Sequence, residues 1–172
     1  MNSPALTAEN LKALLHLVPL SFEGGFYSET YRSPTVLAPS ALPAGYVGPR
    51  HACTAIYYLL EPGTFSELHR VASDEIFHFY LGDPVEMLQL LPDGSSRQCL
   101  IGTDIAGGMT PQLVVPQGIW QGSRLAPGGS FALLGCTVSP GFEYADYESG
   151  SRALLSRAYP AQAALIAELT RA

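Results

Sequence analysis

The feature that most constrains the fold is a series of short apolar segments separated by turn residues, from Phe26 to about Leu133. The 172-residue chain contains 14 prolines and 17 glycines, which favours many short strands over long helices. Many strands at even spacing predict an all-β antiparallel sandwich or barrel. The expected strands are Cys53–Leu60, Thr64–Val71, Glu75–Tyr80, Val85–Leu91, Arg97–Ile101, Gln112–Val115, Ile119–Leu125 and Ser130–Val138.

Helical patterns flank this series on both sides. Leucines recur at helical spacing after Thr7, a good N-cap, and Pro19 ends the pattern, which predicts a helix over about 7–18. The tail over about 151–171 returns to helical composition. We therefore expect one domain over 1–172, with a barrel core over about 22–148 and a short helical segment at each end.

Composition excludes several classes of function. The net charge is -6 and Lys12 is the only lysine, so a nucleic-acid surface or binding to acidic membranes is not expected. No apolar segment approaches the roughly 20 residues that span a bilayer, and the N-terminus does not resemble a secretory signal. The three cysteines are an odd number without close pairing, which favours reduced thiols and a cytoplasmic location.

One hairpin carries most of the chemical information. Gly63, His69, Glu75 and Gly82 lie on two consecutive predicted strands and their turns. Strand alternation places Glu75 and Phe77 on one face of the second strand. If the faces of both strands point inward, His69 and Glu75 enter a mostly apolar pocket, as is typical of small-molecule sites. A buried His–Glu pair that only stabilises the barrel is the alternative interpretation.

The spacing Gly63-x5-His69 … Glu75-x6-Gly82 resembles the first signature of the cupin superfamily, G-x5-H-x-H-x3,4-E-x6-G, with Val71 at the second histidine. The second signature, G-x5-P-x-G-x2-H-x3-N, is echoed by Pro116-Gln-Gly118, with Gln121 at the histidine. Over about residues 11–165 the chain resembles the fifth cupin family, whose function is unassigned. The residues that carry this wider resemblance are Glu23-Gly-Gly-Phe-Tyr27, Glu29-Thr-Tyr-Arg32, His69-Arg70, Ser73-Asp-Glu75, His78, Gln112, Val115-Pro116, Trp120-Gln121, Gly135-Cys136 and Pro140-Gly-Phe142.

The resemblance implies a double-stranded β-helix, which is a jelly-roll barrel, related in fold to sugar-nucleotide epimerases and small-ligand binders. It also implies a homodimer, and the Phe26–Arg32 strand could pair with the sheet of a neighbouring subunit. No substrate follows from it.

A metal site remains open at this point. His69, Glu75 and Gln121 form a tentative ligand set for one weakly bound divalent metal ion, since amide oxygens suit hard cations. An empty or water-filled site is the other interpretation, because a neutral amide replaces imidazole poorly and Val71 supplies no donor.

Without metal, His69 beside Glu75 would form a general acid/base unit in which the carboxylate orients the imidazole ring. A tyrosine could supply the acid on the opposite face, and Tyr57, Tyr58, Tyr27 and Tyr80 are available. Tyr57 is the candidate catalytic residue among them, although strand tyrosines are more often core residues. The candidate ligand contacts are Gln121, Phe77, Phe79, Ile119, Trp120 and Tyr27. Trp120 is either a core anchor or a lid.

Two classes of function fit this sequence, so whether the protein is an enzyme stays open. The first is a cupin isomerase, epimerase or lyase that uses acid/base chemistry on a small polar compound, with sugar-related compounds among the candidates. The alternative is a non-catalytic cupin that binds or senses a small ligand. A purely structural cupin with a filled interior is a third, weaker possibility.

Overall fold

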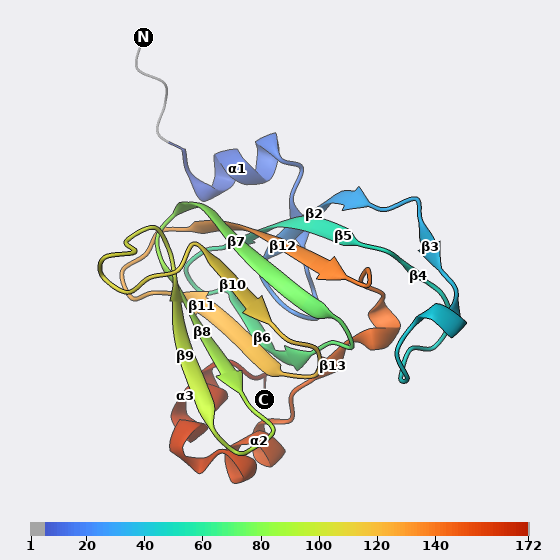
Figure 1. The fold of residues 1–172 in the computed structure, drawn as a ribbon. Coiled ribbons are helices and arrows are strands. Elements are labelled where there is room, and N and C mark those ends of the chain that lie inside the picture. Colours follow the sequence, from blue (N-terminus) through green and yellow to red (C-terminus); the bar gives the residue numbers. More distant parts are fainter. Residues whose placement is uncertain (1–5, 172) are drawn as a thin grey trace.

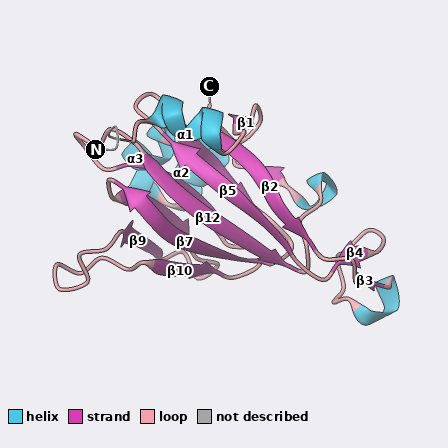
Figure 2. Ribbon diagram, turned by 90° about the horizontal axis from the view of Figure 1, so that it is seen from above, coloured by secondary structure: helices cyan, strands magenta, loops and turns pink. Residues whose placement is uncertain are grey.

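Two antiparallel sheets face each other across a hydrophobic interior in this computed structural model, which describes residues 6–171 (Figures 1 and 2). Within these residues the larger sheet contains, in spatial order, β1 (Val18–Pro19), β2 (Phe26–Arg32), β5 (Thr54–Leu60), β12 (Ala132–Ser139), β7 (Asp74–Gly82) and β10 (Gln112–Val115). The smaller sheet contains β13 (Glu148–Ser149), β6 (Phe65–Arg70), β11 (Trp120–Leu125), β8 (Val85–Leu90) and β9 (Ser96–Ile101). This arrangement confirms the expected all-β jelly-roll, and every strand expected from the sequence is present.

The N-terminal helix is shorter than expected. Helix α1 spans Ala8–Leu14, and its N-cap Thr7 accepts a hydrogen bond from the backbone N–H of Asn10. The predicted end at residue 18 is wrong because His16 has a φ of 53°, which leaves the right-handed helical region. The helix packs through the buried Leu11 on the outer face of the larger sheet.

The C-terminal tail forms two helices rather than one continuous segment. Helix α2 spans Arg152–Ala158 and α3 spans Ala163–Glu168, with a 3₁₀ turn over Pro160–Gln162 between them. A proline interrupts an α-helix because it lacks the backbone N–H and clashes with the preceding turn. Both helices lie against the outer face of the smaller sheet, where Leu155 and Ile166 pack on Leu68 (Figure 1).

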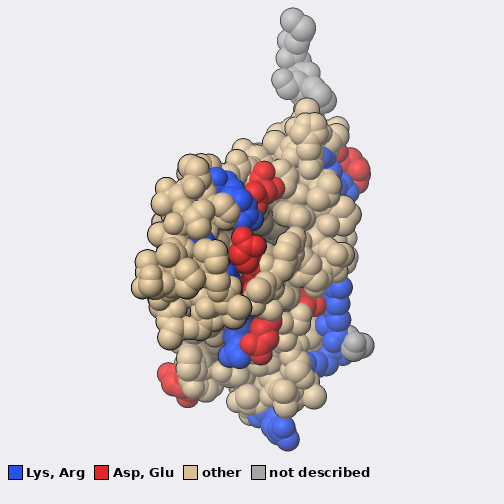
Figure 3. Space-filling model, turned by 90° about the vertical axis from the view of Figure 1, so that its right-hand side faces the viewer, with Lys and Arg blue, Asp and Glu red and all other residues tan. Residues whose placement is uncertain are grey.

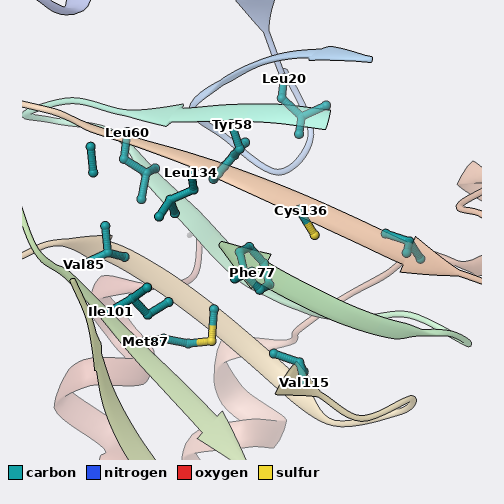
Figure 4. Close-up of a cluster of buried hydrophobic side chains, with 12 residues drawn as sticks. Leu20, Tyr58, Leu60, Phe77, Val85, Met87, Ile101, Val115, Leu134 and Cys136 are labelled. Atoms are coloured by element: carbon teal, nitrogen blue, oxygen red, sulfur yellow. The ribbon is translucent and has the colours of Figure 1, made fainter. Parts of the chain in front are cut away.

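One half of the barrel interior is filled by large apolar side chains from both sheets (Figure 4). These fully buried residues are Leu60, Val85, Met87, Ile101 and Leu134. Alternation along each strand produces this layer, since Tyr58 and Leu60 of β5 point inward while Leu59 points out towards α1.

A short two-stranded segment projects from one end of the barrel (Figures 1 and 2). It consists of β3 (Val36–Leu37) and β4 (Arg50–His51). Arg50 forms a buried ion pair with Asp146, with a closest N–O distance of 2.6 Å. This pair connects the segment to the 3₁₀ turn Tyr144–Asp146, which borders the cavity described below. The helices formed by the described residues do not have the length and hydrophobicity that a membrane crossing requires.

Candidate ligand cavity

The other half of the barrel interior is hollow. A cavity of about 130 Å³ lies there, and its wall is mainly apolar with several ionisable groups. Exposed residues such as Glu29 and Tyr144 line one side, whereas the buried His69 and Glu75 line the other. The complete lining is Leu20, Phe22, Glu23, Tyr27, Glu29, Thr54, Ile56, Tyr58, His69, Glu75, Phe77, Cys136, Val138, Phe142 and Tyr144.

Much of this wall is formed by the inward-facing, alternate residues of strands in the larger sheet. Ile56 and Tyr58 on β5, Glu75 and Phe77 on β7, and Cys136 on β12 all face the interior because alternate residues of a strand share a face. Figure 4 shows the side chains of Tyr58, Phe77 and Cys136 directed into the space between the sheets. The cavity is therefore built on paired strands of the larger sheet, which hold its lining residues rigidly.

Glu23 reaches the cavity from a tight turn between β1 and β2. Gly24 has a φ of 108°, and a Cβ atom there would collide with the carbonyl oxygen of Phe65, so this position requires glycine. The Tyr58 hydroxyl donates to the Gly24 carbonyl at 2.9 Å. The Ser66 hydroxyl donates to Glu23 Oε1 at 2.7 Å and holds that carboxylate at the cavity wall.

The polar centre of the cavity wall is a chain of three side chains from three strands. The Gln121 amide group donates to His69 Nε2 at 2.9 Å and to Glu75 Oε2 at 3.1 Å. His69 and Gln121 are paired across β6 and β11, and Glu75 comes from the opposite sheet. His69 Nε2 and Glu75 Oε2 are 4.0 Å apart, which is too long for a hydrogen bond. The amide therefore bridges the two groups.

The imidazole of His69 is oriented by the backbone rather than by a carboxylate. Its Nδ1 lies 2.7 Å from the carbonyl oxygen of Glu67, which can only accept, so Nδ1 carries the proton. The ring also stacks on Tyr147, with centroids 4.8 Å apart. Nε2 accepts from the Gln121 amide N–H and is therefore the unprotonated nitrogen, the state that a general base requires.

Burial perturbs the ionisable groups around Glu75. Desolvation raises the pKa of Glu75 above its ordinary value, and this outweighs the lowering that His69 would exert when its ring is protonated. The carboxylate of Glu23 raises it further, because two like charges share the cavity. Burial also raises the pKa of Cys136 and of Tyr58 well above their ordinary values, so the thiol and the phenol stay protonated at neutral pH. The Cys136 thiol donates to Glu75 Oε1 at 3.8 Å.

The donor set does not fit a divalent metal. Transition metals in cupin-like sites need three or four imidazole or carboxylate ligands, and the side chain at the second histidine position is the buried Val71. Gln121 presents its amide N–H groups to His69 and Glu75, and these cannot ligate a cation. No cluster of three histidine, cysteine, aspartate or glutamate side chains suited to a metal occurs within residues 6–171. The described residues therefore supply no complete ligand set for a divalent metal.

The structure brings five of the predicted site residues together. His69, Glu75, Phe77 and Tyr27 line the cavity, and Gln121 is fully buried behind it between His69 and Glu75. The expected contact of Glu75 with the His69 ring is replaced by the amide bridge and by the Glu67 carbonyl.

The other four predicted residues lie outside the cavity wall. Tyr57 packs on the outer face of the larger sheet, edge-to-face with Tyr80 at 5.9 Å, because its neighbour Tyr58 takes the inward position. Trp120 likewise faces outward, beneath the Arg70 guanidinium. Phe79 and Ile119 pack against the interior core but do not line the cavity.

Sequence reasoning missed several residues of the wall. Cys136 could have been found by alternation, since Leu134 and Val138 share its strand face. Glu23, Phe142 and Tyr144 lie in turns, where no periodic signal places a side chain. Glu67 contributes a backbone carbonyl, which residue type cannot reveal.

The rim of the cavity is held by charged and phenolic groups. Arg32 donates to Glu29 at 2.8 Å and to Glu143 at 2.9 Å. The hydroxyls of Tyr27 and Tyr144 lie 3.4 Å apart, and this contact raises the pKa of Tyr144 to about 12. On the face drawn in Figure 3, acidic and basic side chains lie next to each other rather than in patches of one sign.

Comparison with known proteins agrees with this architecture. Residues 9–150 match the family described as Cupin superfamily (DUF985). The chain belongs to this cupin family. An uncharacterised protein from Saccharomyces cerevisiae is 31% identical over 134 residues, which cover 73% of this chain and 66% of that protein. The chain thus spans just under two thirds of the length of this curated relative.

Solved structures extend the likeness over almost the whole chain. A hypothetical protein from Leishmania major is 34% identical with a TM-score of 0.86, covering 97% of this chain and 100% of that one. A protein from Shewanella oneidensis is 35% identical with a TM-score of 0.86, covering 97% and 99%. An oxalate decarboxylase from Bacillus subtilis is 14% identical with a TM-score of 0.51, covering 89% and 39%, and shares the cupin fold alone.

Proposed function

We propose that this cupin binds a small organic molecule in the barrel cavity and that His69 and Glu75 perform acid/base chemistry on it, as an isomerase, epimerase or lyase would. One observation carries the proposal. The unprotonated Nε2 of His69 and a carboxyl group with a raised pKa lie together at the buried side of a mostly apolar cavity. A carboxyl group with a raised pKa beside an imidazole in a cavity is typical of catalytic sites.

The two groups are suited to different halves of a proton transfer. His69 Nε2 would accept a proton from a ligand carbon next to a carbonyl group, once the ligand displaces the Gln121 amide from the ring. Glu75, whose raised pKa lets it hold a proton nearer to neutral pH, would return a proton to another atom of the ligand. Gln121 could then donate to the ligand carbonyl oxygen, where negative charge develops.

A non-catalytic binding role is the second candidate, and one contact favours it. The Gln121 amide donates to the lone pair of His69 Nε2, which is the pair that a base must use. If the ligand leaves this contact in place, the cavity binds without turnover.

Hydrogen–deuterium exchange separates the two functions without knowledge of the substrate. The protein is incubated in D₂O with a panel of small hydroxy ketones, aldehydes and sugars, and proton NMR follows the loss of each carbon-bound proton. The acid/base role predicts exchange in at least one compound, abolished by His69→Gln and retained by Trp120→Phe, which alters an aromatic residue outside the cavity.

The outcomes of this assay are distinct. Exchange that survives His69→Gln would contradict the role of His69. Absence of exchange in every compound, together with saturable binding of one of them, would replace the enzymatic proposal by the binding role.

A further inference from the structure

The cavity contains a carboxylate without a counterion. Glu23 lines the wall, and its hydrogen-bond partner is the neutral hydroxyl of Ser66. Among residues 6–171, no lysine or arginine lies within ion-pair distance of Glu23. Glu23 is half-buried, and an anion that has lost part of its hydration is stabilised by a paired positive charge. A ligand with a positive charge or hydrogen-bond donors would therefore stabilise the Glu23 carboxylate.

Acceptors predominate elsewhere in the same site. Glu75 is 6% exposed, and in its contacts with Gln121 and Cys136 it is the hydrogen-bond acceptor. Gln121 is fully buried, and its Oε1 atom has no hydrogen-bond partner among the described residues. A buried carbonyl oxygen without a donor is unusual in folded proteins. The two carboxyl groups on the wall, Glu23 and Glu75, thus accept few hydrogen bonds, and a donor-rich ligand would add more.

Aromatic rings supply much of the remaining wall, and their faces are electron-rich. Phe22 and Tyr144 pack edge-to-face with centroids 5.1 Å apart, and Phe142 and Tyr144 do so at 5.4 Å. The aromatic lining residues are Phe22, Tyr27, Tyr58, Phe77, Phe142 and Tyr144. Aromatic walls beside a carboxylate attract organic cations by cation–π and ionic interaction, most strongly where water is excluded.

We propose that the cavity selects a small organic cation, a protonated or methylated amine, over neutral and anionic compounds of the same size. This inference rests on the proposed binding function and names the class of its ligand. The cation lies between the aromatic rings with its charge towards Glu23. A dicarboxylate is disfavoured, because Glu23 would repel it and Arg32, the arginine at the rim, is already paired with two glutamates.

Three probes of matched shape test the charge preference. They are choline, its uncharged tert-butyl analogue 3,3-dimethylbutan-1-ol, and the anion of tert-butylacetic acid, 3,3-dimethylbutanoate (tert-butylacetate). Isothermal titration calorimetry measures the affinity of each for the full chain. We expect choline to bind at least about tenfold more tightly than the uncharged analogue, since a desolvated cation–π contact is worth that much or more. Tert-butylacetate is expected to bind most weakly.

Charge-removing variants locate the effect. Glu23→Gln keeps an acceptor for Ser66 but removes the negative charge, and should lower the preference for choline at least about threefold, because only the cation–π part remains, while the uncharged analogue binds as before. Glu143→Gln is the control. It removes one negative charge from a glutamate that pairs with Arg32 outside the cavity lining, and it should leave the preference unchanged. Retained binding of the uncharged analogue also shows that each variant is folded.

Each other result is informative. Equal binding of choline and its uncharged analogue, or tighter binding of tert-butylacetate, would overturn the charge inference and leave the cavity as a binding site. A preference for choline that is unchanged in Glu23→Gln would overturn the role of Glu23. Failure of all three probes to bind at millimolar concentration would overturn the inference, and the deuterium-exchange assay would then judge the acid/base function separately.

Discussion

The two halves of the barrel interior differ although the same strands form both. At one end Leu60 of β5 and Leu134 of β12 are fully buried against side chains of the smaller sheet. Two residues away on the same strand faces, Tyr58 and Cys136 border the cavity instead. Figure 4 shows both groups pointing into the same interior. The same strands therefore border a packed layer at one end and a cavity at the other, with different side chains at alternate positions.

The packed end and the cavity end also differ in how their buried side chains contribute to stability. The packed end contains apolar groups, which give up no hydrogen bonds with water when they are buried. Their burial contributes hydrophobic free energy to folding. The cavity end buries His69, Glu75 and Gln121, of which one amide oxygen remains unsatisfied. Such polar burial lowers stability, and proteins retain it where it serves a function.

The largest effect is expected from matched leucine truncations at the two ends. Leu60→Ala should lower the free energy of unfolding by about 3–5 kcal/mol, because it leaves a new void in a filled layer. Leu20→Ala should cost about half as much, since Leu20 already borders empty space. Urea denaturation of both variants provides the measurement. Equal losses would show that the two ends are packed alike and would contradict the comparison.

A smaller effect is expected from the pH dependence of stability at the cavity end. The pKa of Glu75 is raised by burial above its ordinary value of 4.5, so the unfolded chain releases this proton at a lower pH than the folded protein. The stabilising contribution of Glu75 is complete below about pH 4.5 and is lost as the pH rises through the folded-state pKa. Denaturation at several pH values should show this loss in the wild type.

Glu75→Gln isolates that contribution, because glutamine does not ionise. Relative to the wild type, the variant should gain stability as the pH rises above about 4.5. Parallel pH profiles for the two proteins would mean that Glu75 ionises as readily in the folded state as in the unfolded chain.

Local periodicity predicted the strands, and the resemblance to the cupin signatures implied the jelly-roll barrel. The period of two in strands placed Glu75 and Phe77 on one face of their strand without tertiary information. The same period could not decide between Tyr57 and Tyr58, or between Trp120 and Gln121, as contributors to the cavity. Which face of a strand turns inward is set by the partner sheet and the helices outside it.

The chemical detail of the site was not predictable for a different reason. The amide bridge depends on the distance between two sheets, and Gln121 lies between His69 and Glu75 only once the barrel has closed. Glu23 enters through a turn whose course is set by Gly24 and its close approach to Phe65. Spacing in the sequence carries neither of these facts.

Nitrogen-15 NMR of the histidine side chains tests the central claim most directly. The account holds that His69 presents an unprotonated Nε2 beside the cavity while Nδ1 donates to the Glu67 carbonyl. At neutral pH it predicts a protonated, pyrrole-like Nδ1 signal and a pyridine-like Nε2 signal for His69, assigned by their loss in His69→Gln. A proton on Nε2, in either the opposite tautomer or the doubly protonated ring, would contradict it.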